Sequence, residues 1–209
     1  MIKRLALCVL AASALVLAAC NETSTLTRPS DPVVVTGGQV PGPIGEEPGR
    51  VVAFRHDMVE GAGAWTQVPV QVDERTVVPF GSQPGNNAKA GVTGTVYGNG
   101  SGGPTALQYA DPNTWVGADA DPTVDADDEI AFMGFDSGGQ ARVETGDSSG
   151  VVPGSGTMVE VGDPRGDNER GWVYLYRSTG GLDPSAGQDY VDYDFNLTSG
   201  DYKSTYKRA

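Results

Sequence analysis

Trp65-Thr66-Gln67-Val68-Pro69-Val70-Gln71-Val72-Asp73 alternates apolar and polar side chains along its length. A period of two places the three valines on one face of a β-strand and Gln67, Gln71 and Asp73 on the other. Such a strand is half-buried, with its valine face toward a core. Because Pro69 has no N–H to donate to a neighbouring strand, we expect this segment to lie at a sheet edge or beside a bulge.

Short apolar runs recur from residue 50 onward, separated by segments rich in Gly, Pro, Asn or Asp. The whole chain has 30 Gly and 14 Pro, and no helical periodicity is present, so residues 50–209 are predicted to form an all-β domain. We expect an antiparallel β-sandwich or a partly open barrel. The other predicted strands are Arg50–His56, Thr76–Phe80, Val92–Tyr97, Thr105–Tyr109, Ile130–Phe135, Met158–Val161, Trp172–Tyr176 and Tyr190–Phe195.

The N-terminus has the layout of an export signal. Lys3 and Arg4 precede an uncharged apolar run from Leu5 to Ala19. This run is shorter than the about 20 residues that a membrane-spanning helix needs. A basic start, an apolar middle and small residues at the end are typical of a signal peptide, here residues 1–19.

Leu17-Ala18-Ala19-Cys20 resembles the lipobox of bacterial lipoprotein precursors. The resemblance implies cleavage before Cys20, a diacylglycerol on its thiol and acylation of the freed amine. Two or more acyl chains hold a protein stably on a membrane. Asn21 stands where the family's inner-membrane retention signal has Asp, so in a cell with two membranes we expect the outer one.

The remaining cysteine and the charge limit the chemistry. The only other cysteine, Cys8, lies inside the signal peptide, so the mature domain has neither disulfides nor cysteine-held metals. The net charge is -13, and removal of Lys3 and Arg4 makes the mature chain more acidic still. Such a surface repels phosphate backbones, so we expect no nucleic-acid partner.

Residues 20–49 are predicted to be a flexible tether that follows the lipidated Cys20. The segment consists mainly of Thr, Ser, Pro, Gly and acidic residues. Prolines and glycines interrupt it too often for a packed element. Only Val33–Val35 is an exception, and this run is able to add an edge strand.

The most acidic stretch precedes the predicted strand Ile130–Phe135, and it has two interpretations. Aspartates at alternate positions are typical of loops that wrap oxygen ligands around Ca²⁺, although the EF-hand spacing is absent. The alternative is a solvated acidic turn in which Asp side chains cap backbone amides. The candidate ligands are Asp119, Asp121, Asp125, Asp127, Asp128 and Glu129.

A second resemblance covers roughly residues 50–195. The motifs Val68–Glu74, Asp125–Phe132 and Asp136–Gly139 are similar to an N-terminal β-sandwich segment of some secreted bacterial proteins that carry polysaccharide-acting domains. The resemblance implies an accessory module without catalytic function. It leaves open whether the chain acts alone or is the N-terminal part of a larger protein.

Four aromatic residues are candidates for ligand binding, because aromatic faces stack on sugar rings. Trp115 lies in a turn-forming segment, Asp-Pro-Asn-Thr-Trp-Val-Gly, and we expect it to be exposed. In the strand Trp172–Tyr176, alternation puts Trp172, Tyr174 and Tyr176 on one face. This face is predicted to be a binding platform, while the opposite face meets the core.

Signals for catalysis are weaker than those for binding. Gly146–Gly150 matches Gly-x-Ser-x-Gly, but the residues after it cannot begin the helix that a nucleophile elbow needs. His56 is the only histidine, and we expect it at the surface or at a strand edge. We therefore expect a lipid-anchored module that binds a ligand or polysaccharide, with Ca²⁺ as the candidate cofactor. The alternatives are a carbohydrate-active enzyme or its accessory domain, and a structural lipoprotein that contacts other envelope proteins.

Overall fold

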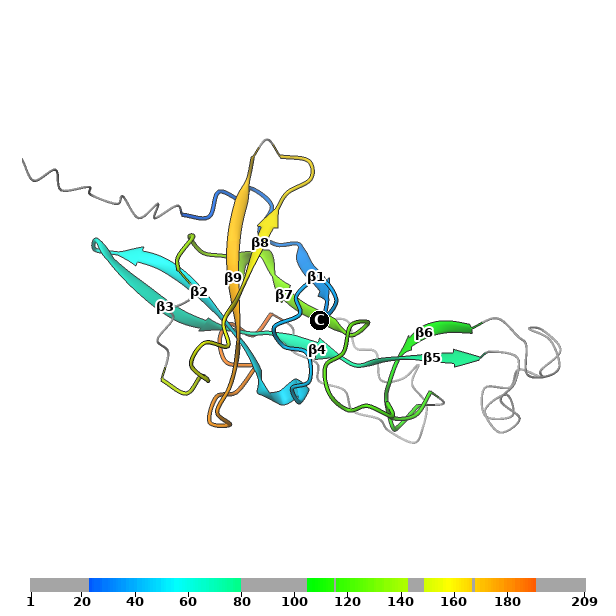
Figure 1. Cartoon of the computed structure of the whole chain (residues 1–209). Helices are drawn as coiled ribbons and strands as arrows, with labels where there is room; N and C mark the ends of the chain where they lie inside the picture. Colours follow the sequence, from blue (N-terminus) through cyan, green and yellow to red (C-terminus); the bar gives the residue numbers. More distant parts are fainter. Residues whose placement is uncertain (1–22, 80–104, 115, 143–148, 167, 191–209) are drawn as a thin grey trace, which may run out of the picture.

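The computed structural model describes residues 23–79, 105–114, 116–142, 149–166 and 168–190 (Figure 1). Within these ranges every extended element pairs in an antiparallel sheet, no sheet closes into a barrel and no α-helix is present. The predicted all-β class is confirmed, and the arrangement is that of a β-sandwich with a projecting arm.

The larger sheet has four strands in the order β3-β2-β9-β8. Its first hairpin turns at Glu60 and Gly61, whose φ angles are 52° and 84°. Two consecutive positive φ angles are what a two-residue type I′ hairpin turn requires. The strands are β2 (Val51–Val59), β3 (Ala62–Val68), β8 (Thr157–Gly162) and β9 (Arg170–Arg177).

The second sheet has three strands in the order β1-β7-β4, and a separate two-stranded sheet forms the arm at the right of Figure 1. Two short 3₁₀ helices, η1 (Pro48–Arg50) and η2 (Gly134–Asp136), complete the described elements. The strands of the second sheet are β1 (Pro32–Thr36), β4 (Gln71–Asp73) and β7 (Glu129–Met133), and those of the arm are β5 (Arg75–Pro79) and β6 (Thr105–Tyr109).

The segment Trp65–Asp73 is not one strand, as its alternation predicted, but two strands in different sheets. β3 ends at Val68 and β4 begins at Gln71. Between them, Pro69 has no N–H, and the Val70 N–H donates to Pro184 O at 3.0 Å instead of to a strand. Val68 and Val70 are nevertheless buried, so the predicted valine face does point to the core.

The core between the sheets is built mainly from valine, and its members come from both layers. Alternate residues of each strand point into it, which is the pattern of two sheets packed face to face. The buried members are Val40, Val51, Ala53, Val68, Val70, Val124, Ile130, Phe132, Val159, Val161, Val173 and Leu175.

The aromatic face of β9 is buried, so the predicted binding platform is wrong. Trp172, Tyr174 and Tyr176 are 2%, 0% and 4% exposed and pack with Val52 and Phe54 of β2. Alternation was predicted correctly, but the four-stranded sheet is covered on both faces. The residues packed against the aromatic face are Trp65 of the neighbouring strand β3 and the loop residues Ala141, Val151 and Leu182.

His56 is also buried, at 7% exposure, which corrects the expected surface position. Its ring lies 5.0 Å from that of Trp65 on the aromatic face of the four-stranded sheet. Gly138 brings a loop against the backbone here, since a Cβ at this position would lie 2.3 Å from His56 O. The close approach allows the Gly139 N–H to donate to His56 O at 2.6 Å.

The predicted tether is wrong for residues 23–49, which belong to the folded domain. β1 pairs with β7 along its whole length, so Val33–Val35 does form an edge strand. Val40 is buried in the core, and the Thr25 N–H donates to Arg170 O at 2.7 Å. The domain boundary predicted at residue 50 therefore falls inside the fold, and residues 20–22 lie outside the described residues.

The remaining strand predictions differ mainly at their ends. β6 has the predicted bounds, whereas β7 ends at Met133 because the chain turns into η2. The predicted strand Val92–Tyr97 lies outside the described residues, as does Tyr190–Phe195 except for its first residue.

Candidate functional site

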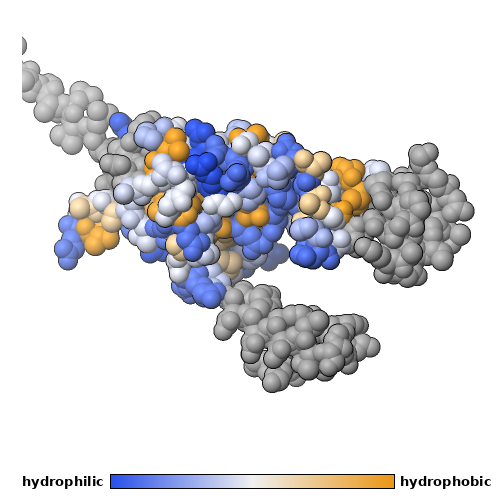
Figure 2. Space-filling model, turned by 90° about the horizontal axis from the view of Figure 1, so that it is seen from below, coloured by the Kyte–Doolittle hydropathy of each residue, from blue (hydrophilic) through white to orange (hydrophobic). Residues whose placement is uncertain are grey.

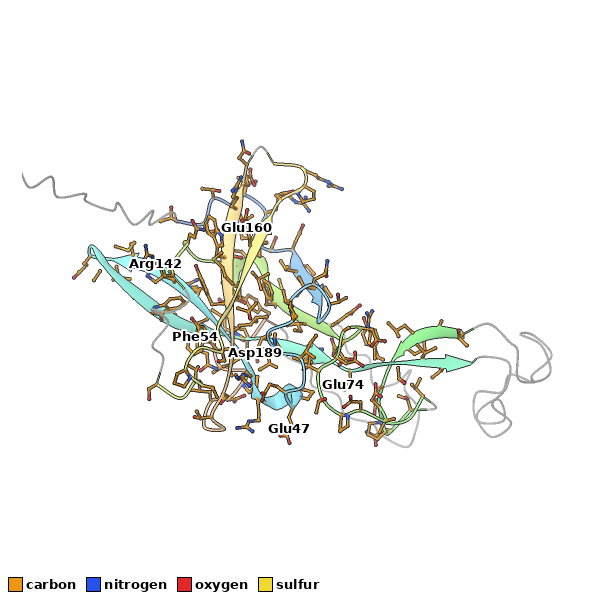
Figure 3. The ribbon with its side chains drawn as sticks, in the orientation of Figure 1. Glu47, Phe54, Glu74, Arg142, Glu160 and Asp189 are labelled. Carbon is orange, nitrogen blue, oxygen red and sulfur yellow. The ribbon has the colours of Figure 1, made fainter. Side chains whose placement is uncertain are left out.

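Three carboxylates from two distant parts of the chain meet where the arm joins the sandwich. Glu74 occupies the one-residue break between β4 and β5 (Figure 3), Asp119 lies in the loop after β6, and Asp128 directly precedes β7. One oxygen of each lies within 4.8 Å of the others. We call Glu74, Asp119 and Asp128 the carboxylate cluster.

Glu74 is the unusual member of the carboxylate cluster. Both of its carboxylate oxygens are buried, and neither has a hydrogen-bond partner among the described residues. The pKa of Glu74 is raised from 4.5 to about 7, first by burial and then by the negative charges of Asp128 and Asp119. A buried carboxylate without a partner is costly, so this position favours either a proton or a cation.

Asp128 is fully buried, and its carboxylate is held by backbone N–H groups. Arg75 N donates to Oδ1 at 2.7 Å, and Asp125 N donates to Oδ2 at 2.8 Å. Because Arg75 immediately follows Glu74, the first hydrogen bond ties Asp128 to the strand break that carries Glu74. Each carboxylate oxygen keeps a second lone pair that a cation is able to use.

Asp119 is positioned by a turn within its own loop. Its Oδ1 accepts a hydrogen bond from Asp121 N at 3.1 Å, and Asp121 Oδ1 in turn accepts from Thr123 N at 3.3 Å. These are Asx-type turns, in which a short acidic side chain binds the backbone two residues on. The capping of backbone amides expected for an acidic turn is therefore present in this loop.

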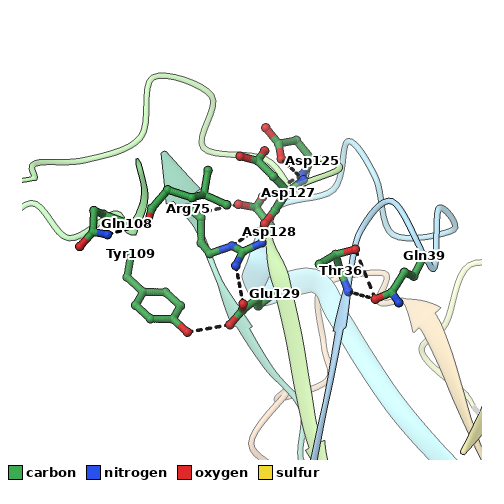
Figure 4. Close-up of polar contacts among 10 residues, drawn as sticks. Thr36, Gln39, Arg75, Gln108, Tyr109, Asp125, Asp127, Asp128 and Glu129 are labelled. Carbon is green, nitrogen blue, oxygen red and sulfur yellow. Dashed lines mark hydrogen bonds and ion pairs between the residues drawn. The ribbon is translucent and has the colours of Figure 1, made fainter. Parts of the chain in front are cut away.

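Glu129, a predicted metal ligand, contacts Arg75 and Tyr109 instead of the carboxylate cluster (Figure 4). Its carboxylate forms an ion pair with Arg75 and accepts a hydrogen bond from Tyr109 OH at 2.7 Å. That hydrogen bond raises the pKa of Tyr109. Glu129 thus connects β5, β6 and β7 but does not join the carboxylate cluster.

Asp125 and Asp127 form a local pair instead of facing Glu74 as ligands. Asp127 N donates to Asp125 Oδ1 at 2.9 Å. A side-chain hydrogen bond between the two carboxyl groups lowers the pKa of Asp125 and raises that of Asp127. Of the six predicted ligands, the structure therefore brings only Asp119 and Asp128 into the cluster.

Residues 37–46, predicted as tether, fix the acidic loop in place. Gly37 N donates to Asp128 O at 3.0 Å, and Gly38 N donates to Ala126 O at 2.9 Å. A Cβ on Gly37 would lie 1.9 Å from Asp125 O, so only glycine allows this approach. The carboxylate cluster is therefore part of a fixed framework.

Sequence reasoning missed Glu74, and a signal for it was present. Asp73-Glu74-Arg75 places three charged residues in a row where an alternating strand ends. The first member is on β4, the last begins β5, and Glu74 in the break turns toward the acidic loop. Which loop it would meet depends on the tertiary fold.

Two predicted site residues, Cys20 and Trp115, lie outside the described residues. No described helix is long and apolar enough to cross a membrane. No family model matches this sequence, and no curated protein or solved structure is significantly similar to it.

Proposed function

We propose that this protein is a lipid-anchored, non-catalytic module of the bacterial cell envelope whose fold is stabilised by Ca²⁺ at the carboxylate cluster. The observation that carries the cation site is the Glu74 carboxylate, buried without a hydrogen-bond donor beside Asp119 and Asp128. The lipid anchor rests on the resemblance of Leu17–Cys20 to a lipobox.

Calcium is the cation that these residues suit best. It takes six to eight oxygen ligands at about 2.3–2.6 Å, in flexible geometries, and uses carboxylates and loop carbonyls. The carboxylate cluster offers oxygens only, and among the described residues no cysteine or histidine lies in it. Calcium sites of extracellular modules bind with Kd values of about 10⁻⁴–10⁻³ M.

The cation would fasten the β5–β6 arm to the sandwich. A two-stranded sheet is marginally stable alone. Val77 and Tyr109 on this arm are each 58% exposed, and apolar surface is visible at the right of Figure 2, where the arm lies. Because Glu74 directly precedes β5 and Asp119 follows β6, a cation shared with Asp128 would hold both chain segments that connect the arm to the sandwich.

A binding function is better supported than catalysis by the described residues. His56, the sole histidine, is buried against Trp65, and no serine or threonine hydroxyl of the described residues is hydrogen-bonded to it. Asp128, with both carboxylate oxygens already bound by backbone N–H groups, is placed to hold a structure together.

Thermal unfolding in calcium and in EDTA tests the cation site. At a calcium concentration ten times Kd, binding stabilises the folded state by about 1.4 kcal/mol, which raises Tm by about 3–6 °C in a protein of this size. Glu74→Gln should abolish the rise. Glu47→Gln, a matched change of an exposed acidic residue, should keep it. An equal rise in both variants would contradict the proposal.

The anchor is tested separately by mass spectrometry of the protein purified from membranes. We expect a mature N-terminus at Cys20 carrying acyl chains. Cys20→Ser should release the protein from the membrane fraction. An unmodified Met1 on the native protein would contradict anchoring and leave the calcium result unaffected.

A further inference from the structure

β8 has an outer edge that no described strand covers. It is the last strand of the order β3-β2-β9-β8. Trp172 of β9 exchanges both of its backbone hydrogen bonds with Gly138, on the side away from β8. Glu160 is paired with Trp172, so it belongs to a non-hydrogen-bonded pair, and its own N–H and C=O point outward. By alternation, the same holds for Met158 and Gly162.

The edge of β1 and the end of β3 are blocked, whereas the edge of β8 is open. On β1, Pro32 has no N–H, and Thr36 exchanges hydrogen bonds with Gln39 at 2.9 Å. The end of β3 is bordered by residues 183–187, since Gln67 Nε2 donates to Asp183 O at 2.6 Å. Such devices are how proteins prevent unwanted pairing at sheet edges. β8 contains no proline and offers three outward pairs of backbone groups in a row.

A groove of about 460 Å³ runs beside this edge, between β8 and the segment that leads into β1. Its volume lies in the range of ligand-binding clefts. Charged side chains, among them Glu160 and Arg28, also line it. The apolar residues of its wall are Leu26, Pro32, Val33, Val161 and Pro164.

We propose that the outer edge of β8 binds an extended segment of another protein by β-strand addition. Backbone groups of the added strand would pair with Met158, Glu160 and Gly162. Since side chains alternate between faces, every second side chain of the added strand would enter the groove beside its apolar wall residues. The intervening side chains would lie beside Met158, which is 39% exposed, and Glu160.

The charge of Glu160 indicates which kind of strand the edge of β8 would bind. Glu160 lies on β8 (Figure 3), with half of its side chain exposed and its ion pair to Arg170 long, at 3.4 Å. A basic side chain on the added strand meets this carboxylate, whereas an acidic one is repelled. A second copy of β8, paired antiparallel about its centre, would set Glu160 against Glu160. The partner is therefore a strand that alternates apolar and basic residues.

A six-residue synthetic peptide of alternating lysine and valine is the probe, titrated at physiological salt and followed by NMR. We expect the backbone amides of Met158, Glu160 and Gly162 to shift and to become protected from exchange. A peptide with three lysines followed by three valines has the same charge but cannot alternate, so it serves as the control.

Substitutions of Glu160 separate backbone pairing from charge. Glu160→Pro and Glu160→Gln both remove the carboxylate, but only the proline also removes the outward N–H, and it leaves the bonds to β9 intact because an edge strand tolerates proline there. Relative to Glu160→Gln, Glu160→Pro should bind the alternating peptide about five- to tenfold more weakly, as expected for the loss of one hydrogen bond. Glu160→Lys keeps the strand and should reverse the preference toward a peptide of alternating glutamate and valine.

Three results would overturn the proposal. The first is no binding at millimolar peptide. The second is equal binding of the alternating and the block peptides, or an equal affinity of Glu160→Pro and Glu160→Gln for the alternating peptide. The third is a concentration-dependent dimer in sedimentation that Glu160→Pro dissociates, which would make a second copy the occupant. None of these results depends on the carboxylate cluster, which contains no residue of β8.

Discussion

Ionisation of Glu74 should destabilise the calcium-free protein as pH rises, which is the opposite of the usual behaviour of a carboxylate. The pKa of this group is raised from 4.5 to about 7 in the folded state, by burial first and then by the neighbouring aspartates. A folded state that binds the proton more tightly than the unfolded state is favoured at low pH. Stability should therefore fall between about pH 4.5 and pH 7 and change little from this cause above pH 7.

The size of the effect follows from the two pKa values. Without screening by solvent, a change in the pKa of Glu74 from 4.5 to about 7 corresponds to about 3 kcal/mol in the free energy of unfolding. The side chain as a whole is only half-buried, so water and counter-ions screen it. We therefore expect ionisation of Glu74 to lower the free energy of unfolding by about 1–2 kcal/mol.

Urea unfolding of wild type and Glu74→Gln in EDTA, from pH 4.5 to pH 8, measures this effect. The difference between the two proteins removes the contribution of the other carboxylates. The variant should match the wild type at pH 4.5 and exceed it by about 1–2 kcal/mol at pH 8. With calcium the order should reverse, because the ion needs the ionised form. A constant difference across this range would refute our interpretation of Glu74.

Three further substitutions test the packing. Tyr174→Phe should cost about 1–2 kcal/mol in urea unfolding, because the hydroxyl accepts a hydrogen bond from Ala141 N at 2.5 Å; an exposed platform would lose nothing. Val40→Ala should cost about 2 kcal/mol by the same assay, since the residue is in the core, whereas a tether would show no change. Gly138→Ala should lower Tm, at a cost of about 1–3 kcal/mol, as its Cβ would collide with His56 O.

Local patterns in the sequence predict most of the strands, and they do so for a physical reason. A sheet with a buried face demands a side-chain period of two, and frequent Gly and Pro end each run after a few residues. For Thr105–Tyr109, the predicted bounds are those of β6. The same rule fails at Pro69, where two alternating runs in phase belong to different sheets.

Local patterns do not predict which segments bury the second face of a sheet. Alternation in Trp172–Tyr176 correctly separates two faces, but nothing in it indicates that loops cover the aromatic one. The carboxylate cluster could not be predicted in full for the same reason. Asp119 and Asp128 are visible as an acidic run, whereas their contact with Glu74 depends on how β4 and β5 approach that loop.

The segment predicted as a tether has the largest consequence for function. Because Thr25 is already bonded to Arg170, a lipid on Cys20 would be joined to the fold by about five residues. Five extended residues span at most about 18 Å. The domain would thus lie at the membrane surface. Leu26, which lines the groove beside β8, directly follows the five residues that would join the lipid to the fold. A protein that pairs with β8 would therefore be one that itself reaches the membrane surface.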